Sequence, residues 1–217
     1  MTSDEIRCTV EGVFTGRIER HWPDKAPSAI HKTAADGPQI IGPSGIETDA
    51  QADLTVHGGA DKALHHYAAD HYVTWREEGL LPGDATPAAF GENISTTGIT
   101  ETDLCIGDVF RLGTALVQIS QGREPCWKLC EYTGQPTMAY RFRKTARTGW
   151  YYRVLEAGRL APGDEMSLTD RPHPEWSLHE VSVALLSRRV PKQTAAQLVA
   201  LPVLAEAWRK TFSQLAG

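Results

Sequence analysis

Short runs of alternating apolar and polar residues recur along the first 170 residues, and this period-2 pattern is typical of β-strands. The clearest run is Ala-Leu-Val-Gln-Ile at residues 115–119, which leads directly into a charged, cysteine-containing segment. The other predicted strands fall at residues 8–20, 28–32, 54–56, 90–95, 104–113, 149–155 and 163–168. Because glycine turns separate these strands, the pattern favours a mainly β fold, a barrel with some α-helix, over repeated βαβ units.

Helical periodicity interrupts the strands at three places. The longest predicted helix follows the Gly-Gly turn at residues 58–59, with Asp61 as its N-cap and Gly79 as its stop. Its apolar positions, three or four residues apart, would form a buried stripe of Leu64, Ala68, Tyr72 and Trp75. Short helices are predicted after Cys126 and over residues 137–144. A Gly- and Pro-rich loop is predicted at residues 37–45, and it ends in a polar, exposed stretch at residues 46–53.

A change of composition at residues 171–174, Arg-Pro-His-Pro, predicts a linker between two units, residues 1–170 and 176–217. Beyond it, two capping-box patterns begin at Ser177 and Thr194, and Pro202 is placed to open a third helix. The apolar positions of that third helix are Leu204, Ala207, Trp208, Phe212 and Leu215. Its basic edge would suit a DNA-binding module, but packing on the barrel or on a partner is the preferred interpretation.

Composition excludes several classes of protein. The 217 residues are 41% hydrophobic and carry a formal net charge of −5, which argues against a nucleic-acid-binding protein as a whole. No apolar run is long enough to cross a bilayer, and the first residues do not have the pattern of a secretory signal. The four cysteines are therefore expected to be thiols of a cytoplasmic protein, with no membrane partner.

The segment with the most chemistry is residues 120–130, a strand-to-helix corner that contains Cys126. Pro125 fixes the backbone before the thiol, and Arg123 and Lys128 flank it in the sequence. Cations and a helix start favour the thiolate, which is a nucleophile or a ligand for a soft metal. A buried structural cysteine remains an equal alternative at this point, because that is the common fate of a free cysteine.

Other polar motifs are weaker. The Gly-rich turn at residues 57–62 would offer backbone N–H groups to an anion, and the basic residues between 141 and 147 would suit a phosphate or simply solvent. His57, His65, His66 and His71 lack the spacing of a zinc helix motif, so solvated or core-edge histidines are expected rather than a metal site.

Four of these segments, residues 28–32, 57–62, 90–93 and 121–129, occur in an order that resembles the MOSC domain family, named for the C-terminal domain of molybdenum cofactor sulfurase. The trailing helices resemble its YiiM-like branch. The resemblance implies a β-barrel with peripheral helices and a C-terminal three-helix appendix. One departure stands out, since Gly122 replaces the first proline of the Q-P-R-x-P-C pattern of that branch and loosens the backbone before Arg123.

The resemblance also implies a molybdenum cofactor, with Cys126 as the metal ligand, and pyridoxal phosphate is not expected. The residues implied to hold the pterin and its phosphate are Lys32, His57, Gly58, Gly59, Asp61, Lys62, Asn93, Arg123 and Lys128. Cations and backbone donors suit such a polyanion. The catalytic candidates are Cys126, His57 and Asp61. His57 and Asp61 are assigned to proton relay from residue type alone.

The implied activity is a molybdenum-dependent oxidoreductase that reduces the N–O bond of N-hydroxylated compounds such as hydroxylaminopurine and so detoxifies base analogues. Its electrons would come from a separate flavin or iron–sulfur donor protein, and its oligomeric state is open, with a homodimer one possibility. The first alternative is a carrier of the cofactor or of a persulfide without turnover. Hydrolysis by a cysteine nucleophile and nucleic-acid binding by the terminal helices rank behind it.

Overall fold

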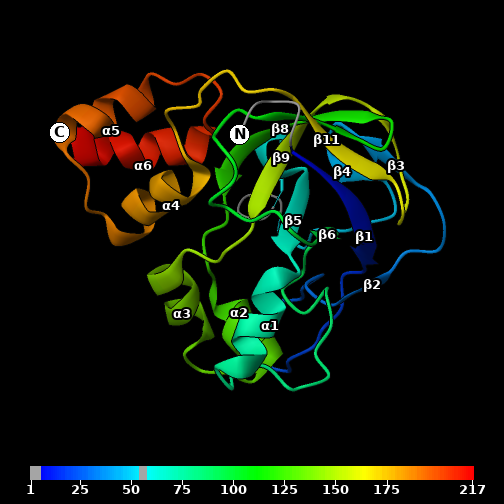
Figure 1. The fold of residues 1–217 in the computed structure, drawn as a ribbon. Helices are drawn as coiled ribbons and strands as arrows, with labels where there is room; N and C mark the ends of the chain where they lie inside the picture. Colours follow the sequence, from blue (N-terminus) through cyan, green and yellow to red (C-terminus); the bar gives the residue numbers. More distant parts are fainter. Residues whose placement is uncertain (1–5, 54–57) are drawn as a thin grey trace.

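A computed structural model of the chain describes residues 6–53 and 58–217, so the predicted strand at residues 54–56 and His57 lie outside the described residues. Seven strands close into a barrel in the order β11-β7-β8-β9-β5-β6-β1, with β1 paired to β11 (Figure 1). Their bounds are β1 (Arg7–Gly16), β5 (Leu64–Ala68), β6 (Ile94–Thr96), β7 (Val109–Leu112), β8 (Ala115–Gly122), β9 (Trp150–Glu156) and β11 (Glu165–Asp170). The predicted barrel is confirmed, and β5–β6 is its parallel pair among antiparallel neighbours.

Further short strands extend this frame. β2 (Lys32–Ala34) continues the end of β1, and β3 (Gln39–Gly42), β4 (Gly45–Ile46) and β10 (Gly158–Leu160) form a separate three-stranded sheet. The prediction of a loop at residues 37–45 is therefore wrong, and Ile46 is not exposed as residues 46–53 were predicted to be. Ile41 and Ile46 face each other in this sheet and are buried. The glycines and prolines around them are typical of a loop, so the sequence pattern does not show these strands.

The predicted helix from Asp61 to about residue 78 is wrong in its first half. A single 3-10 turn, η2 (Ala60–Lys62), precedes β5, and the helix α1 (Asp70–Glu77) begins only afterwards. All five residues of β5, which lies between β6 and β9, are buried. Because neither face is exposed to solvent, the sequence of β5 lacks the alternation of apolar and polar residues that identifies a strand. The predicted stop is confirmed, because Gly79 follows the helix with φ +68°.

Helices α1, α2 (Trp127–Thr133) and α3 (Met138–Thr145) lie together at one end of the barrel (Figure 1). The predicted helices after Cys126 and at 137–144 are confirmed within a residue or two. These helices share a second hydrophobic cluster, made of Tyr67, Tyr72, Trp75, Leu80, Leu81, Phe90, Leu129, Met138 and Phe142. Because Tyr67 belongs to β5, this cluster fixes the helices against the outside of the barrel wall.

Three C-terminal helices, α4 (Leu178–Ser187), α5 (Lys192–Val199) and α6 (Glu206–Ala216), confirm the predicted helical region. Ser177 caps α4 as predicted, accepting from the Glu180 N–H at 3.5 Å. The other two starts are corrections. Proline at 191 already begins α5, so Thr194 lies inside its first turn, and Pro202 lies in a turn four residues before α6.

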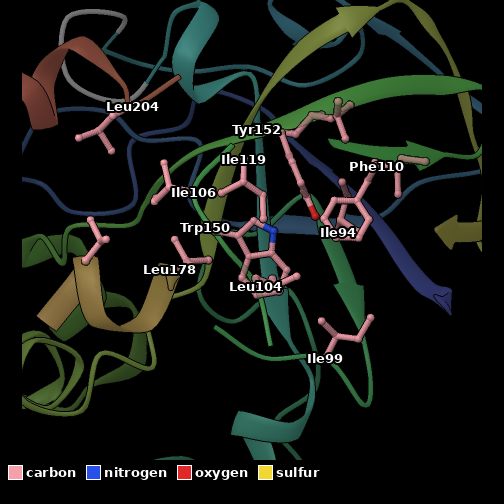
Figure 2. Close-up of a cluster of buried hydrophobic side chains, with 14 of the residues drawn as sticks. Ile94, Ile99, Leu104, Ile106, Phe110, Ile119, Trp150, Tyr152, Leu178 and Leu204 are labelled. Atoms are coloured by element: carbon pink, nitrogen blue, oxygen red, sulfur yellow. The ribbon is translucent and has the colours of Figure 1, made fainter. Parts of the chain in front are cut away.

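The C-terminal helices pack on the barrel through one continuous hydrophobic cluster. Leu178 and Leu204 face Trp150 and Ile106 of the barrel region in Figure 2, and Trp208 and Phe212 of α6 belong to the same cluster. Within α6, the predicted apolar position at residue 207 is exposed, which corrects that part of the stripe. Across residues 6–53 and 58–217, no helix has both the length and the apolar character to cross a membrane.

Candidate functional site

A hollow lies outside the barrel wall, where the outward faces of β5 and β9 meet the surrounding loops. It encloses about 550 Å³ of space, including its open mouth. His65 of β5 and Tyr151 of β9 are register partners and line it, while Leu64, His66, Trp150 and Tyr152 beside them are fully buried. The alternation of each strand therefore divides its side chains between the barrel core and this hollow.

Cys126 lies at the corner that the sequence predicts. β8 ends at Gly122, and Cys126 is the N-cap of α2 with an extended backbone of φ −121° and ψ 168°. Its side chain is half-buried and lines the hollow, so the structure decides against a cysteine walled in by apolar side chains. The Arg123 N–H donates to the Gly149 carbonyl at 3.0 Å and holds the corner against the start of β9.

The glycine that departs from the family pattern has a packing reason. A Cβ atom at Gly122 would lie 2.4 Å from the Ser182 hydroxyl oxygen and 3.0 Å from the Trp208 ring. The C-terminal helices α4 and α6 occupy the space that a larger residue would need. The corner is therefore kept rigid by packing and by its backbone hydrogen bonds.

Four cations line the hollow: Lys32, Lys62, Arg123 and Lys128. Arg123 and Lys128 are only 6% and 8% exposed, and no described carboxylate forms an ion pair with either. Arg123 Nη1 donates to the Phe90 carbonyl at 2.5 Å, which aims its guanidinium across the hollow. Burial lowers the pKa of Lys62, and the carboxylates of Glu124 and Asp61 oppose that shift. Buried cations without acidic partners are costly unless an anion neutralises them.

Asp49 holds the remaining cation in place. Its Oδ2 accepts from Lys32 Nζ and from Asn93 Nδ2 at 2.8 Å, and its Oδ1 accepts from the Gly16 N–H at 2.7 Å. Burial lowers the pKa of Lys32, although the Asp49 carboxylate opposes that shift. Asn93 in turn accepts from the His65 N–H at 3.1 Å, so the network reaches the barrel wall. Sequence reasoning missed Asp49 and placed it in an exposed loop, but its side chain is 2% exposed.

His65 and Tyr151 also belong to the hollow and were missed as site residues. Their ring centroids lie 5.0 Å apart. Burial and the charge of Arg123 put the pKa of His65 well below its usual range, so its imidazole is neutral. Burial raises the pKa of the Tyr151 phenol, which Arg123 opposes. The His65 ring is buried against the turn before β9, where a Cβ atom at Gly149 would lie 3.0 Å from Nε2.

Some predicted site residues lie elsewhere. Gly58, Gly59 and Asp61 line a separate groove beside α6, which shares Lys62 with the hollow. The Asp61 carboxylate accepts from Arg153 Nη2 at 2.7 Å and from the N–H of residue 206 at 3.1 Å. Asp61 therefore caps α6 rather than the helix predicted to start at its own position. His57 lies outside the described residues.

A buried carboxylate supports the hollow from behind. Glu101 accepts from the N–H groups of Thr148 and Gly149, at 2.9 and 2.6 Å, and from His71 Nε2 at 2.7 Å. Burial acts to raise the pKa of Glu101, but these hydrogen bonds and the His71 charge outweigh it and the pKa is lowered. Because Gly149 also accepts from the Arg123 N–H, Glu101 fixes the turn on which the corner rests.

Comparison with known proteins agrees with this arrangement. Residues 53–167 match the MOSC domain family, and residues 176–215 match the YiiM-like 3-alpha helix domain. Protein YiiM of Escherichia coli is 35% identical over 205 residues, which cover 93% of this chain and 90% of that protein. The chain belongs to the YiiM-like branch of the MOSC-domain family.

One solved structure and one further sequence relative are also similar to this YiiM-like chain. The crystal structure of YiiM from Geobacillus stearothermophilus superposes with a TM-score of 0.82 at 30% identity, covering 97% of this chain and all of that one. A protein of Gibberella moniliformis named Reductase is 38% identical over 194 residues, which are 88% of this chain but 34% of that protein. Membership of the MOSC family, together with a relative named as a reductase, suggests oxidoreductase activity of some kind.

The hollow fits the group that a MOSC domain, a domain of molybdenum cofactor sulfurase type, implies. A molybdenum-pterin cofactor is a polyanion with a soft metal centre. Cys126 offers the soft sulfur ligand, and Arg123 and Lys128 offer buried cations that form no ion pair with a described carboxylate. The residues present therefore match the charge and the ligand preference of the cofactor.

Proposed function

We propose that this YiiM-like chain binds a molybdenum-pterin cofactor in the hollow, with the Cys126 sulfur as a ligand of the metal. The observation that carries the proposal is the pair of buried cations, Arg123 and Lys128, that have no described carboxylate partner beside a half-buried thiol. Such a pair is stable when an anion occupies the space between the side chains.

The proposed reaction is the two-electron reduction of an N-hydroxylated compound such as hydroxylaminopurine. One N–O bond breaks, two electrons and two protons are consumed, and the products are the amine and one water molecule. The bound cofactor supplies the redox chemistry at the N–O bond. The electrons come from a separate donor protein of the flavin or iron–sulfur class.

The chain's own residues bind, orient and shield. Arg123 and Lys128 hold the anionic parts of the cofactor, and Lys62 adds a third cation at the edge shared with the neighbouring groove. Asp49 keeps the Lys32 ammonium in one position, so that this cation is aligned before a ligand arrives. His65 stays neutral and forms part of the lining of the hollow.

Metal analysis of wild type and Cys126→Ala, both expressed with an intact cofactor supply, tests the cofactor site. We expect molybdenum in wild type and its loss in Cys126→Ala, with Cys130→Ala as the matched control because Cys130 is also a half-buried thiol on α2. Equal molybdenum content in Cys126→Ala and wild type would contradict the ligand assignment.

Turnover is tested separately. The loaded wild-type protein is mixed with hydroxylaminopurine and a chemical reductant, and formation of the amine is followed by chromatography. Full metal occupancy without amine would reject the reductase and favour the carrier function, in which the same residues hold the cofactor and pass it on.

A further inference from the structure

Five exposed cations lie on α3 and just after α4, two helices that contact each other. Three of them, Arg141, Arg143 and Lys144, lie on α3, and Arg188 and Arg189 follow α4 directly. We call this set the α3–α4 basic patch. None of the five forms an ion pair with an acidic residue in the described part of the chain.

The two groups are joined in space although some 40 residues separate them in the sequence. Arg143 Nη1 donates to the Leu186 carbonyl in the last turn of α4 at 3.5 Å. Figure 1 shows α3 directly below α4, at the side of the molecule away from β3. The patch therefore bridges the barrel unit and the C-terminal helices, and neither sequence segment alone predicts it.

The patch is a positive face on an acidic molecule. The chain carries a formal charge of −5, which would be −10 without these five cations. A helix C-terminus is stabilised by a cation in its last turn, and this explains part of why basic residues lie at the ends of α3 and α4. The α3–α4 basic patch still has a net positive charge. A long polyanion such as nucleic acid would also be repelled by the net negative charge of the rest of the chain, whereas a compact acidic protein would contact the patch alone.

We propose that the α3–α4 basic patch docks a small acidic electron-carrier protein. The inference rests on the proposed function, which consumes two electrons for each N–O bond. α3 packs against α2 through Met138, Phe142 and Leu129, and α2 begins at Cys126. A carrier seated on α3 is thus next to the helix that starts at the hollow. Tyr140, 59% exposed on the same helix, supplies an aromatic contact at the edge of the patch.

Binding to the cofactor-free protein tests the docking surface without any activity. The probe is an acidic flavodoxin, titrated by calorimetry at low ionic strength into wild type, Arg141→Glu, Arg188→Glu and the control Arg159→Glu. Arg159 is an exposed cation on β10, which pairs with β3, and β3 lies on the opposite side of the view from α4 in Figure 1. We expect at least tenfold weaker binding for the two patch variants, unchanged binding for the control, and a steep loss with added salt.

Three results would overturn the inference. They are no flavodoxin or plant-type ferredoxin binding to wild type at low salt, equal weakening in Arg159→Glu, and tighter binding of a 30-base oligonucleotide that the patch variants lose. A second measurement separates this proposal from the proposed function. With reduced methyl viologen as the electron source, the loaded patch variants should keep wild-type turnover, and with flavodoxin they should lose it. Absence of turnover with every reductant rejects the function, while patch-dependent flavodoxin binding would still establish the docking surface.

Discussion

Asp49 is the residue on which the loops around the hollow converge. One carboxylate receives donors from β1, β2 and the loop before β6, three segments that are distant in the sequence. Its partner Lys32 is 7% exposed, so the ion pair is withdrawn from water. Removing one member of a buried ion pair costs more than the pair contributes, because the other charge is left without compensation.

Asp49→Asn is expected to destabilise the protein strongly, because it keeps the shape of the side chain but leaves the Lys32 ammonium unpaired. We expect the free energy of unfolding to fall by about 3 kcal/mol. Urea denaturation followed by tryptophan fluorescence measures the loss. The double variant Lys32→Met/Asp49→Asn removes both charges of this ion pair, so much of the loss of stability should be recovered. Wild-type stability in the single variant would contradict this account.

His66 makes the stability of the barrel depend on pH. It is fully buried, with Nδ1 3.1 Å from the Tyr152 hydroxyl and Nε2 2.9 Å from the Thr96 hydroxyl, and burial lowers its pKa to about 3. Below about pH 6.5 the unfolded chain binds a proton here that the native protein does not. Stability is therefore lost as the pH falls from about 6.5 toward 3, by about 1.4 kcal/mol per pH unit.

His66→Gln removes this titration, so the plot of unfolding free energy against pH should become less steep by that amount. Urea unfolding at several pH values between 7 and 5 measures the slope. His31→Gln, a change at an exposed histidine, is the control and should leave it unchanged. Parallel plots for wild type and His66→Gln would show that His66 is not the titrating group.

Sequence reasoning found the residues of the hollow that are close to one another in the chain. Cys126, Arg123 and Lys128 share one corner, so a single motif reveals them. Asp49 and His65 could not be found this way, because their roles depend on loops and strand register that bring distant segments together. The sequence also does not reveal that Asp61 caps a helix 145 residues away, and its assignment to proton relay stays a prediction.

At the scale of the element, burial explains why β5 was mistaken for a helix. A strand covered on both faces loses the alternation that identifies it, and Leu64, Ala68, Tyr72 and Trp75 happen to keep helical spacing across the boundary between β5 and α1. All four are buried as predicted, but on two different elements. The barrel, the corner and the three terminal helices were predictable because their patterns are exposed on one side.

The turn before β9 has no room for a side chain. Gly149 has φ +72°, and a Cβ there would lie 2.3 Å from the His66 carbonyl oxygen and 2.9 Å from the Tyr67 ring. Gly149→Ala should therefore lower the free energy of unfolding by more than 3 kcal/mol, on the order of a severe core defect. Gly134, with φ +67° and no atom within 4 Å of its Cβ position, is the matched control.

Gly134→Ala carries the backbone strain without the clash, so we expect a loss of about 1 kcal/mol. Thermal unfolding of both variants distinguishes the two contributions. Similar losses in the two would mean that the packing around the turn can relax.

At the scale of the whole molecule, one arginine joins the barrel to the C-terminal helices. Arg153 of β9 donates to Asp61 at 2.7 Å, to Gln118 of β8 at 2.9 Å and to the Val203 carbonyl before α6 at 2.8 Å. Asp61 also caps α6. The predicted boundary at residues 171–174 thus separates two stretches of sequence whose side chains share a hydrophobic cluster and this polar joint.

Asp61→Ala should weaken this joint without altering the Cys126 corner of the hollow. The lost helix cap and the lost partner of Arg153 together cost about 2 kcal/mol, discounted because the Asp61 side chain is 33% exposed. Urea denaturation measures the loss, and Asp61→Asn, which keeps a capping oxygen, should lose less. The rate at which iodoacetamide alkylates Cys126, read by mass spectrometry, should not change. A changed rate would place Asp61 in the chemistry of the hollow after all.

The pairing of β1 with β11 has a consequence for biosynthesis. β1 emerges from the ribosome well before its neighbours in the closed ring, which arrive only with residues 94–96 and 165–170. During most of translation its apolar side chains Val10 and Val13 have nothing to cover them. The nascent chain is thus exposed to self-association until nearly the whole barrel has been made, and chaperones that bind apolar nascent segments should raise its yield.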